Sequence, residues 1–154
     1  MKPGPWSMRL HGFGEVLPYA DNHVTLNEEV KDVHGLPTLS IHAKHRENEA
    51  VMRKDFIAQA MEMLDAAGGK NVESFNGVDH PGFGIHEMGT ARMGRDPKSS
   101  VLNKWNQSHD ISNLFITDGS CMASAACVNP SMTYMALTAR AVDYATKELN
   151  KQNI

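Results

Sequence analysis

The chain has 154 residues and a mass of 17.0 kDa, the size of one ordinary domain. Hydrophobic residues make up 41% and charged residues 21%, which is far from a disordered composition and predicts a folded core. A formal net charge of -3, from 15 basic and 18 acidic side chains, gives no positive field to attract a phosphate backbone. Nucleic-acid binding is therefore not expected.

The sequence contains neither a membrane-span pattern nor a secretion-signal pattern. No run approaches the roughly 18 consecutive apolar residues that a spanning helix needs, and the opening MKPGPWSMRLHG has no apolar stretch like that of a signal peptide. As written, the sequence predicts a cytoplasmic chain, and a periplasmic location would need a signal on a longer version. Cys121 and Cys127 lie in one small-residue loop, and we expect two free, buried thiols there.

Antiparallel strands are expected in the first third of the chain. The stretch 10–17 carries two glycines, and Asp21-Asn22 marks a turn. Apolar and polar residues alternate afterwards, with the apolar positions at Val24, Leu26, Leu39 and Ile41. This pattern predicts a hairpin or meander.

A long helix is expected from Glu47 to Ala67. Its apolar residues recur at helical spacing, at Met52, Phe56, Ala60, Met63, Leu64 and Ala67. Gly68-Gly69 interrupts the pattern in the way that a helix C-cap does.

The rest of the chain combines an irregular region with one short strand and a terminal helix. Residues 71–106 show no lasting period and contain GFGIHEMGTARMGRDP, which predicts a backbone held by specific turns. Residues 114–117 read as a buried strand that stops at Asp118-Gly119, and Asn129-Pro130 read as the N-cap and first position of a helix running to about Asn150. The expected fold class is α+β, with antiparallel strands, two main helices, and a terminal strand and helix.

The motif spacings favour neither a metal site nor a nucleotide site. Eight histidines invite a zinc site, but His86-Glu87 is not followed by a second histidine at zincin spacing, and no metal ligands are expected. Gly89 and Gly94 have the spacing of a phosphate loop, yet Arg95-Asp96 stand where Lys-Ser/Thr is required. A complete dinucleotide-binding glycine motif is also missing from this chain.

Two segments remain that have the features of a site. His86 lies in a glycine-rich turn, and the turn taken alone favours a structural or surface histidine over a functional one. Asn129-Pro130-Ser131 opens a helix, whose N-terminus exposes N–H groups and the positive end of the helix dipole to an anion or an electron-rich ring. The same residues are also readable as an ordinary helix cap packing on a sheet.

Three motifs, in a fixed order along the chain, favour a functional site over these structural interpretations. H-x-x-G-T-x-R-M-G spans 86–94, N-L-F-x-x-D-G-S spans 113–120, and N-P-S-M-T-x-x-A-L-T-x-R-A spans 129–141. Together they resemble the C-terminal region of the glucose-methanol-choline (GMC) oxidoreductases. Within that family they are most similar to bacterial sugar and gluconate dehydrogenase flavoproteins and to pyranose oxidase. The chain, residues 1–154, is thus identified as the substrate-facing catalytic region of such a protein.

The resemblance implies an FAD-dependent oxidation of a CH–OH group on a sugar or related alcohol. His86 would take the hydroxyl proton while hydride leaves for flavin N5, and Asn129 would hold the same oxygen. Residues expected near the cofactor are Asp118, Gly119, Asn129, Pro130, Ser131 and Met132. Thr90, Arg92 and Met93 would support the His86 loop, although Arg92 is also compatible with reaching a substrate or cofactor.

Members of this family begin with a βαβ unit that holds the ADP part of FAD, and this sequence has no such unit. We therefore expect a fragment, a split gene product, or a subunit whose partner is an FAD-binding N-terminal half or companion chain. Apolar surface that such a partner covers should be exposed here. A noncatalytic remnant or binding module that keeps the fold is the alternative interpretation.

Overall fold

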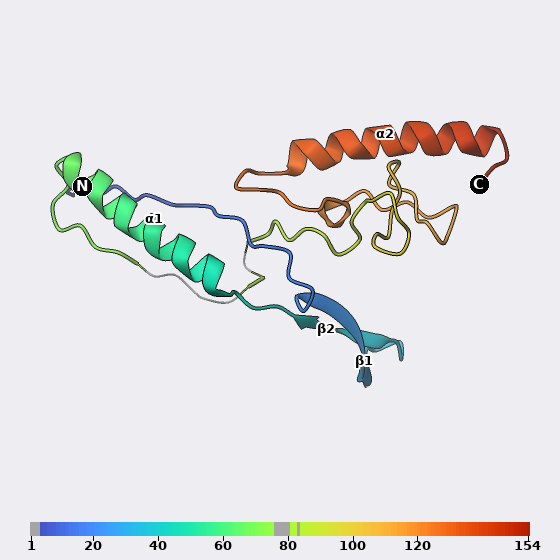
Figure 1. Ribbon diagram of the computed structural model, residues 1–154, viewed down its shortest axis with the longest axis horizontal. Helices are drawn as coiled ribbons and strands as arrows, with labels where there is room; N and C mark the ends of the chain where they lie inside the picture. Colours follow the sequence, from blue (N-terminus) through green and yellow to red (C-terminus); the bar gives the residue numbers. More distant parts are fainter. Residues whose placement is uncertain (1–3, 76–80, 83) are drawn as a thin grey trace.

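The computed structural model describes residues 4–75, 81–82 and 84–154, and its regular elements lie within residues 23–66 and 119–150 (Figure 1). The sheet consists of β1, His23–Lys31, and β2, Pro37–His42. The long helices are α1, Glu47–Ala66, and α2, Ser131–Asn150. This composition confirms the expected α+β class with an antiparallel pair and two main helices.

The predicted hairpin is confirmed. β1 and β2 pair antiparallel, with Val24 opposite Ile41 and Leu26 opposite Leu39, so that the four apolar residues share one face. In the connecting turn the Asp32 carboxylate accepts the backbone N–H groups of two later turn residues, at 2.8 and 2.9 Å. The turn closes the hairpin, and a register shift between Asn27 and Lys31 separates it from the paired apolar positions.

The stretch 10–17 is not a strand, which corrects the expectation of a strand there. It is an extended coil that runs alongside α1 (Figure 1). A Cβ atom on Gly12 would lie 2.4 Å from the Phe56 ring, and one on Gly14 would lie 2.5 Å from the Met52 methyl group. The two glycines therefore serve close packing against the helix, and this demand outweighs the strand pattern.

The helix prediction for α1 is confirmed to within one residue. Gly68 adopts a left-handed conformation with φ of 82°, and its N–H bonds the Asp65 carbonyl at 2.9 Å. The N–H of Gly69 bonds the Leu64 carbonyl at 2.9 Å. The Gly-Gly pair therefore caps the helix in the way its sequence indicates.

Glu49 fastens the N-terminal coil to the first turn of α1. Its carboxylate is almost fully buried and accepts the backbone N–H of Arg46 at 2.8 Å, the N–H of Leu17 at 3.1 Å and the hydroxyl of Tyr19 at 3.2 Å. Burial acts to raise the pKa of this carboxyl, but the donors from Arg46 and Leu17 outweigh it and lower the pKa to about 2.

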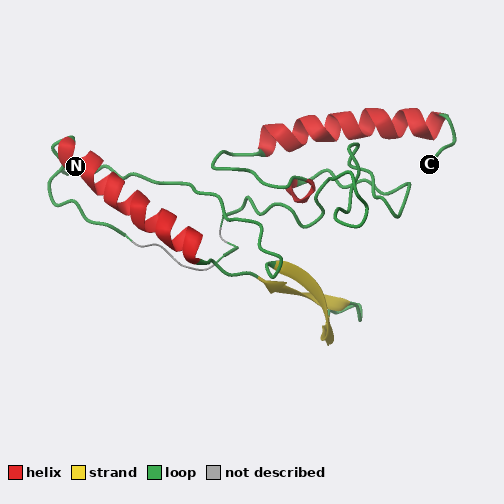
Figure 2. Cartoon of the chain, viewed as in Figure 1, coloured by secondary structure: helices red, strands yellow, loops and turns green. Residues whose placement is uncertain are grey.

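The expected strand at 114–117 is not formed as a regular strand, and this part of the prediction is wrong. Phe115 makes a single bridge to Gln107, and the N–H of Ile116 bonds the Asn106 carbonyl at 3.0 Å. In Figure 2, the segment that leads into the short helix near α2 is coloured as loop and not as strand. A strand needs a neighbouring strand along its length to satisfy its backbone groups. Among the described residues, the bridging backbone partners of this segment come from the irregular loop 106–108 and not from a neighbouring strand.

The C-terminal half has a small core and two free cysteines. The buried apolar residues are Ala91, Leu102 and Cys121, with partly buried Ile116 and Leu137 against them. Both thiols are free as expected; Cys121 is buried, whereas Cys127 is exposed, which corrects its predicted burial. Cys127 lies in a loop to which the core does not extend.

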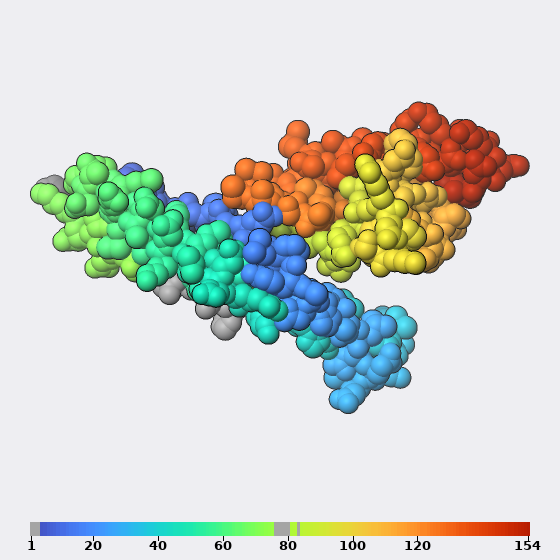
Figure 3. Space-filling model, in the orientation of Figure 1, coloured from blue at the N-terminus to red at the C-terminus, as the bar shows by residue number. Residues whose placement is uncertain are grey.

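The accessible surface is large for the chain's mass. It amounts to 12306 Å², against roughly 7,700 Å² for a typical folded monomer of this mass. The space-filling view shows an extended outline from which the hairpin projects (Figure 3). The apolar hairpin face is largely uncovered, with Leu39 exposed by 64% and Ile41 by 74%. None of the helices within the described ranges is long and apolar enough to cross a bilayer.

Replacing Glu49 with Gln should destabilise the association of the N-terminal coil with α1 by about 1–2 kcal/mol at neutral pH, because a neutral amide accepts the same donors more weakly. Since the folded pKa of about 2 lies below the ordinary value of 4.5, the contribution of this carboxylate is fully present above pH 4.5 and is lost as pH falls toward 2. Thermal unfolding followed by circular dichroism across this pH range measures both effects.

Glu47→Gln is the matched control, because Glu47 is another acidic residue of the same first turn. Equal stability and equal acid sensitivity in both variants would contradict the proposed role of Glu49 in holding the N-terminal coil to α1.

Candidate active site

The loop that carries His86 is held by backbone bonds to the segment just after Asp118. The N–H of Ala91 bonds the Ser120 carbonyl at 3.1 Å, and the N–H of Met93 bonds the Cys121 carbonyl at 2.9 Å. Both sides of this contact contribute to the small core, through Ala91 and Cys121. The two motifs, distant in sequence, are therefore fixed to each other next to the site.

The beginning of α2 is fixed to the same segment. Thr138 donates its hydroxyl to the Thr117 carbonyl at 3.1 Å, which ties the second turn of the helix to the residue before Asp118. In the first turn, the Ser131 and Tyr134 hydroxyls bond each other at 2.8 Å. The N-terminal end of α2 thus has a defined position relative to the His86 loop.

His86 and Asn129 are brought into direct contact. Nε2 of His86 lies 2.9 Å from Oδ1 of Asn129, although the residues are 43 positions apart in sequence. The other ring nitrogen, Nδ1, lies 2.8 Å from the carbonyl oxygen of Ile85. His86 is half-buried and Asn129 exposed, so a small molecule can reach the pair.

Asn129 is not the helix cap that the sequence predicts. The residue before the first turn of α2 is Pro130, whose carbonyl accepts the N–H of Thr133 at 2.9 Å, and no side chain caps the helix. The Asn129 amide points instead to His86. The Asn129 side chain therefore bonds His86, and α2 begins after Pro130 without a side-chain cap.

Asp118 and Gly119 lie at the short 3-10 helix η1, Gly119–Cys121. The Asp118 carboxylate accepts the Ser120 N–H at 2.9 Å and also the Ser120 hydroxyl, so it caps this turn. A Cβ atom on Gly119 would lie 2.7 Å from the Met88 methyl group. A side chain at Gly119 would therefore collide with Met88 of the His86 loop.

Ser131 and Met132 form the exposed first turn of α2, with Met132 exposed by 79%, while Pro130 is buried. The N–H groups at the start of a helix have no acceptor within it and carry the positive end of the dipole. This end of α2 lies beside Asn129 and suits the electron-rich edge of a ring.

Sequence analysis missed the contact made by the Ile85 carbonyl. Ile85 has φ of 55°, a left-handed conformation that is rare for a β-branched residue and costs about 1–3 kcal/mol. No sequence pattern predicts it, since Asn or Gly would be expected at such a position.

Arg92 donates to the Ser99 carbonyl at 2.6 Å and so stabilises the turn that follows the His86 loop.

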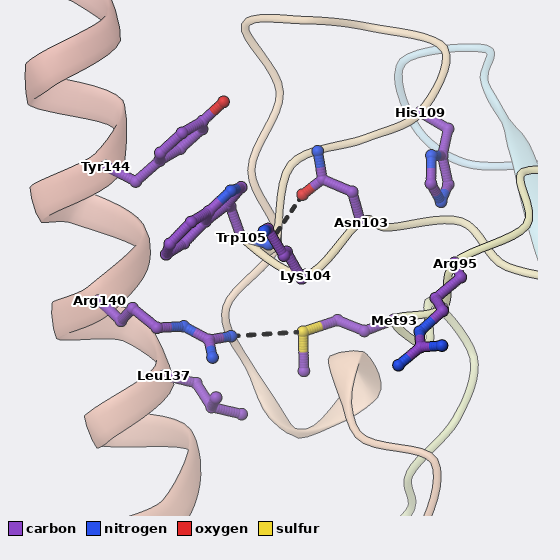
Figure 4. A pocket seen from close by; sticks show the side chains of 10 residues that line it. Met93, Arg95, Asn103, Lys104, Trp105, His109, Leu137, Arg140 and Tyr144 are labelled. Atoms are coloured by element: carbon purple, nitrogen blue, oxygen red, sulfur yellow. Dashed lines mark hydrogen bonds between the residues drawn. The ribbon is translucent and has the colours of Figure 1, made fainter.

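A separate pocket of about 650 Å³ lies along the other half of α2 (Figure 4). Arg140 reaches across it to the Met93 sulfur at 3.7 Å, and Trp105 stacks on Tyr144 with ring centroids 4.8 Å apart. Its lining includes none of the predicted site residues. Among the residues that the structure describes, no three His, Cys, Asp or Glu side chains gather as a metal site.

Comparison with known proteins decides the family. A model of the family described as GMC oxidoreductase matches residues 18–138, a range that includes both His86 and Asn129. The chain belongs to the GMC oxidoreductase family. Members of this family depend on FAD.

Curated relatives are consistent with that assignment. The chain is 40% identical over 138 residues to the 2-methyl-1,2-propanediol dehydrogenase of Mycolicibacterium austroafricanum, covering 90% of this chain and 25% of the relative. It is 34% identical to the fructose dehydrogenase large subunit of Gluconobacter japonicus, over 89% of this chain and 25% of the relative. Against the gluconate 2-dehydrogenase flavoprotein of Pantoea cypripedii the identity is 29%, over 86% and 22%. The chain thus spans about a quarter of the length of the GMC relatives it matches.

Replacing Asn129 with Ala should release the His86 ring without weakening α2, because the Asn129 side chain bonds His86 and caps nothing in the helix. The His86 ring resonances should shift and broaden in NMR spectra, while the helical amide resonances of α2 keep their wild-type positions. An N-cap role would instead cost about 1 kcal/mol of helix stability. Ser131→Ala, which breaks the Ser131–Tyr134 contact one turn away, is the control and should leave the His86 ring unchanged.

Proposed function

We propose that this chain is the C-terminal catalytic part of an FAD-dependent oxidoreductase that oxidises a CH–OH group of a sugar or related alcohol. His86 is the base that takes the hydroxyl proton, and Asn129 positions the same oxygen. The observation that carries the proposal is the 2.9 Å contact between His86 and Asn129, two residues distant in sequence that lie in the family-matched range.

The chemistry of the pair supports these roles. Oxidation of an alcohol removes the hydroxyl proton and a hydride from the carbon, so the site needs a base next to the oxygen. An imidazole titrates close to neutral pH and is the commonest side chain for this purpose. An amide donates and accepts hydrogen bonds without ionising, so it holds the oxygen in place through the change of charge.

The names of the relatives support the substrate class. They specify a diol, fructose and gluconate, and each of these compounds carries hydroxyl groups on carbon. Two of these relatives, both named as dehydrogenases, are 40% and 34% identical to the chain, whereas relatives named as oxidases are 25% to 31% identical. We therefore favour a dehydrogenase over an oxidase for this chain.

The residues around the pair fit a flavin. The exposed first turn of α2, at Ser131 and Met132, would direct its N–H groups at the edge of the ring, where reduction places negative charge. Asp118 and Gly119 would contact the ribityl and pyrophosphate part of the cofactor, with Asn129 and Pro130 beside the ring. When bound, FAD supplies the hydride acceptor for the oxidation.

The protein fold that binds the adenosine half of FAD is expected on a partner, either an N-terminal half of the same protein or a companion chain. The excess of exposed surface and the uncovered apolar hairpin face are what such a partner would cover. Residues 114–117 would then gain the neighbouring strands that they lack here.

In the longer protein, or in this chain combined with the N-terminal half of a close homologue, His86→Ala should lower turnover by about 10²- to 10⁴-fold while FAD stays bound. Asn129→Ala should lower it by roughly 10- to 100-fold, because the substrate oxygen is less well oriented. Steady-state rates with a sugar and the flavin absorbance of each variant measure the two effects.

His34→Ala is the matched control, because His34 is exposed in the turn between β1 and β2. Unchanged turnover in His86→Ala would remove His86 from the mechanism. Loss of FAD in Asn129→Ala would assign that residue to cofactor support instead.

Titration with FAD separates the catalytic interpretation from that of a noncatalytic binding module. We expect the chain alone to hold FAD weakly and the mixture with an N-terminal half to bind it, with bleaching of the visible band by a sugar. Flavin fluorescence and absorbance report both steps. Binding without bleaching by any sugar or alcohol would favour the noncatalytic module.

A further inference from the structure

The pocket along α2 gathers positive charge on a chain that is negative as a whole. Arg95, Lys104 and Arg140 line it, and among its described lining residues there is no Asp or Glu (Figure 4). In the complete sequence 18 acidic residues outnumber 15 basic ones. The positive lining is therefore a local feature of this pocket, and it favours an anion there.

The three cations of the pocket are not neutralised by the chain itself. Asp143 and Glu148, the acidic residues of α2, form their ion pairs with lysines about one turn further along the chain. Within the described part of the chain, no ion pair joins a carboxylate to Arg95, Lys104 or Arg140. An anion entering the pocket would therefore not have to displace an internal partner.

Arg140 is oriented by neutral acceptors that leave part of its guanidinium free to donate. Its Nη2 donates to Oδ1 of Asn106 at 3.4 Å and to the Met93 sulfur at 3.7 Å. Asn106 is fully buried, and its NH₂ group donates to the Ile116 carbonyl at 3.0 Å, so this amide has a fixed position. Among the described residues Nε and Nη1 of Arg140 have no hydrogen-bond partner, and such a fork of donors suits a carboxylate or a phosphate.

An aromatic wall gives the pocket an apolar side. Trp105 stacks on Tyr144 with ring centroids 4.8 Å apart and planes within 5°, and the Phe115 ring meets Tyr144 edge-on at 6.3 Å. The Lys104 ammonium lies 5.1 Å and the Arg140 guanidinium 5.8 Å from the centre of the Trp105 ring. These cation–π contacts hold positive charge next to an apolar surface.

We infer that this pocket binds a small organic anion, whose carboxylate or phosphate is held by Arg140 and whose apolar body lies against the Trp105–Tyr144 wall. Its volume of about 650 Å³ falls within the roughly 300–1,000 Å³ of small-molecule sites. None of the residues proposed for catalysis or for FAD lines the pocket, so this site is separate from the candidate active site.

The test is a titration of the ¹⁵N-labelled chain with benzoate, with phenyl phosphate, and with benzyl alcohol as the uncharged probe. Trp105 reports binding through its indole N–H signal, which is distinguished from that of Trp6 because it disappears in Trp105→Phe. We expect a saturable shift with at least one of the two anions and none with benzyl alcohol at the same concentration. The stronger anion identifies a carboxylate or a phosphate site. No shift with either anion would overturn the inference.

Variants of Arg140 test whether the guanidinium holds the anion. Arg140→Gln should weaken binding by roughly 10- to 100-fold, because hydrogen bonds to a charged group are lost. Arg140→Lys keeps the charge without the fork and should restore only part of the affinity. Arg9→Gln is the matched control, because it removes the same charge from the exposed N-terminal coil. Equal weakening in Arg140→Gln and Arg9→Gln would indicate unspecific attraction and contradict the inference.

The same titration with the chain combined with the N-terminal half of a close homologue, before and after addition of FAD, tests two other occupants. Binding of the anion that persists in both mixtures supports the inference. Loss of binding when the N-terminal half is added would assign the pocket to a contact with that half, and displacement by FAD would assign it to the cofactor. Either result would overturn the small-anion site, while the turnover test of His86→Ala would still stand.

Discussion

The pair of backbone hydrogen bonds between the His86 loop and the turn after Asp118 is the contact on which the candidate site depends. Ala91 and Met93 supply the donors, and Ser120 and Cys121 supply the acceptors. Because Ala91 and Cys121 are also buried in the same core, each bond has one partner in that core, and its loss would leave a buried polar group unsatisfied. Two irregular segments thereby gain a fixed geometry without a sheet or a helix to impose it.

The sequence predicts well the elements whose stability is local. The helix α1 and its Gly68 end, and the pairing of β1 with β2, follow from periodicity and turn chemistry that operate over a few residues. The segment 114–117 fails as a strand because its pattern anticipates neighbours that this chain does not supply. The stretch 10–17 is not a strand because its two glycines pack closely against α1, one of them against Phe56. This is a tertiary constraint, which the local sequence pattern does not reveal.

The candidate site divides in the same way. His86 and Asn129 were identified through motifs, and the structure shows them in contact, but the Asn-Pro pattern alone had assigned Asn129 to the helix cap. Capping and bonding His86 compete for one amide, and the tertiary contact prevails since Pro130 and the first turn form without a side-chain cap. The strained Ile85 backbone has no sequence signal, because it is imposed by the loop around it.

The chain exposes a large surface, yet the His86–Asn129 contact is formed within it. The residues that hold this contact are therefore distinct from the apolar residues that remain exposed. The small core around Leu102 and Cys121 includes Ala91 of the His86 loop, whereas the apolar hairpin face is largely exposed. Covering that face would add hydrophobic stabilisation without changing the local bonds that join His86 to Asn129. The contact between His86 and Asn129 is therefore formed by bonds within this chain, which spans about a quarter of the length of the relatives it matches.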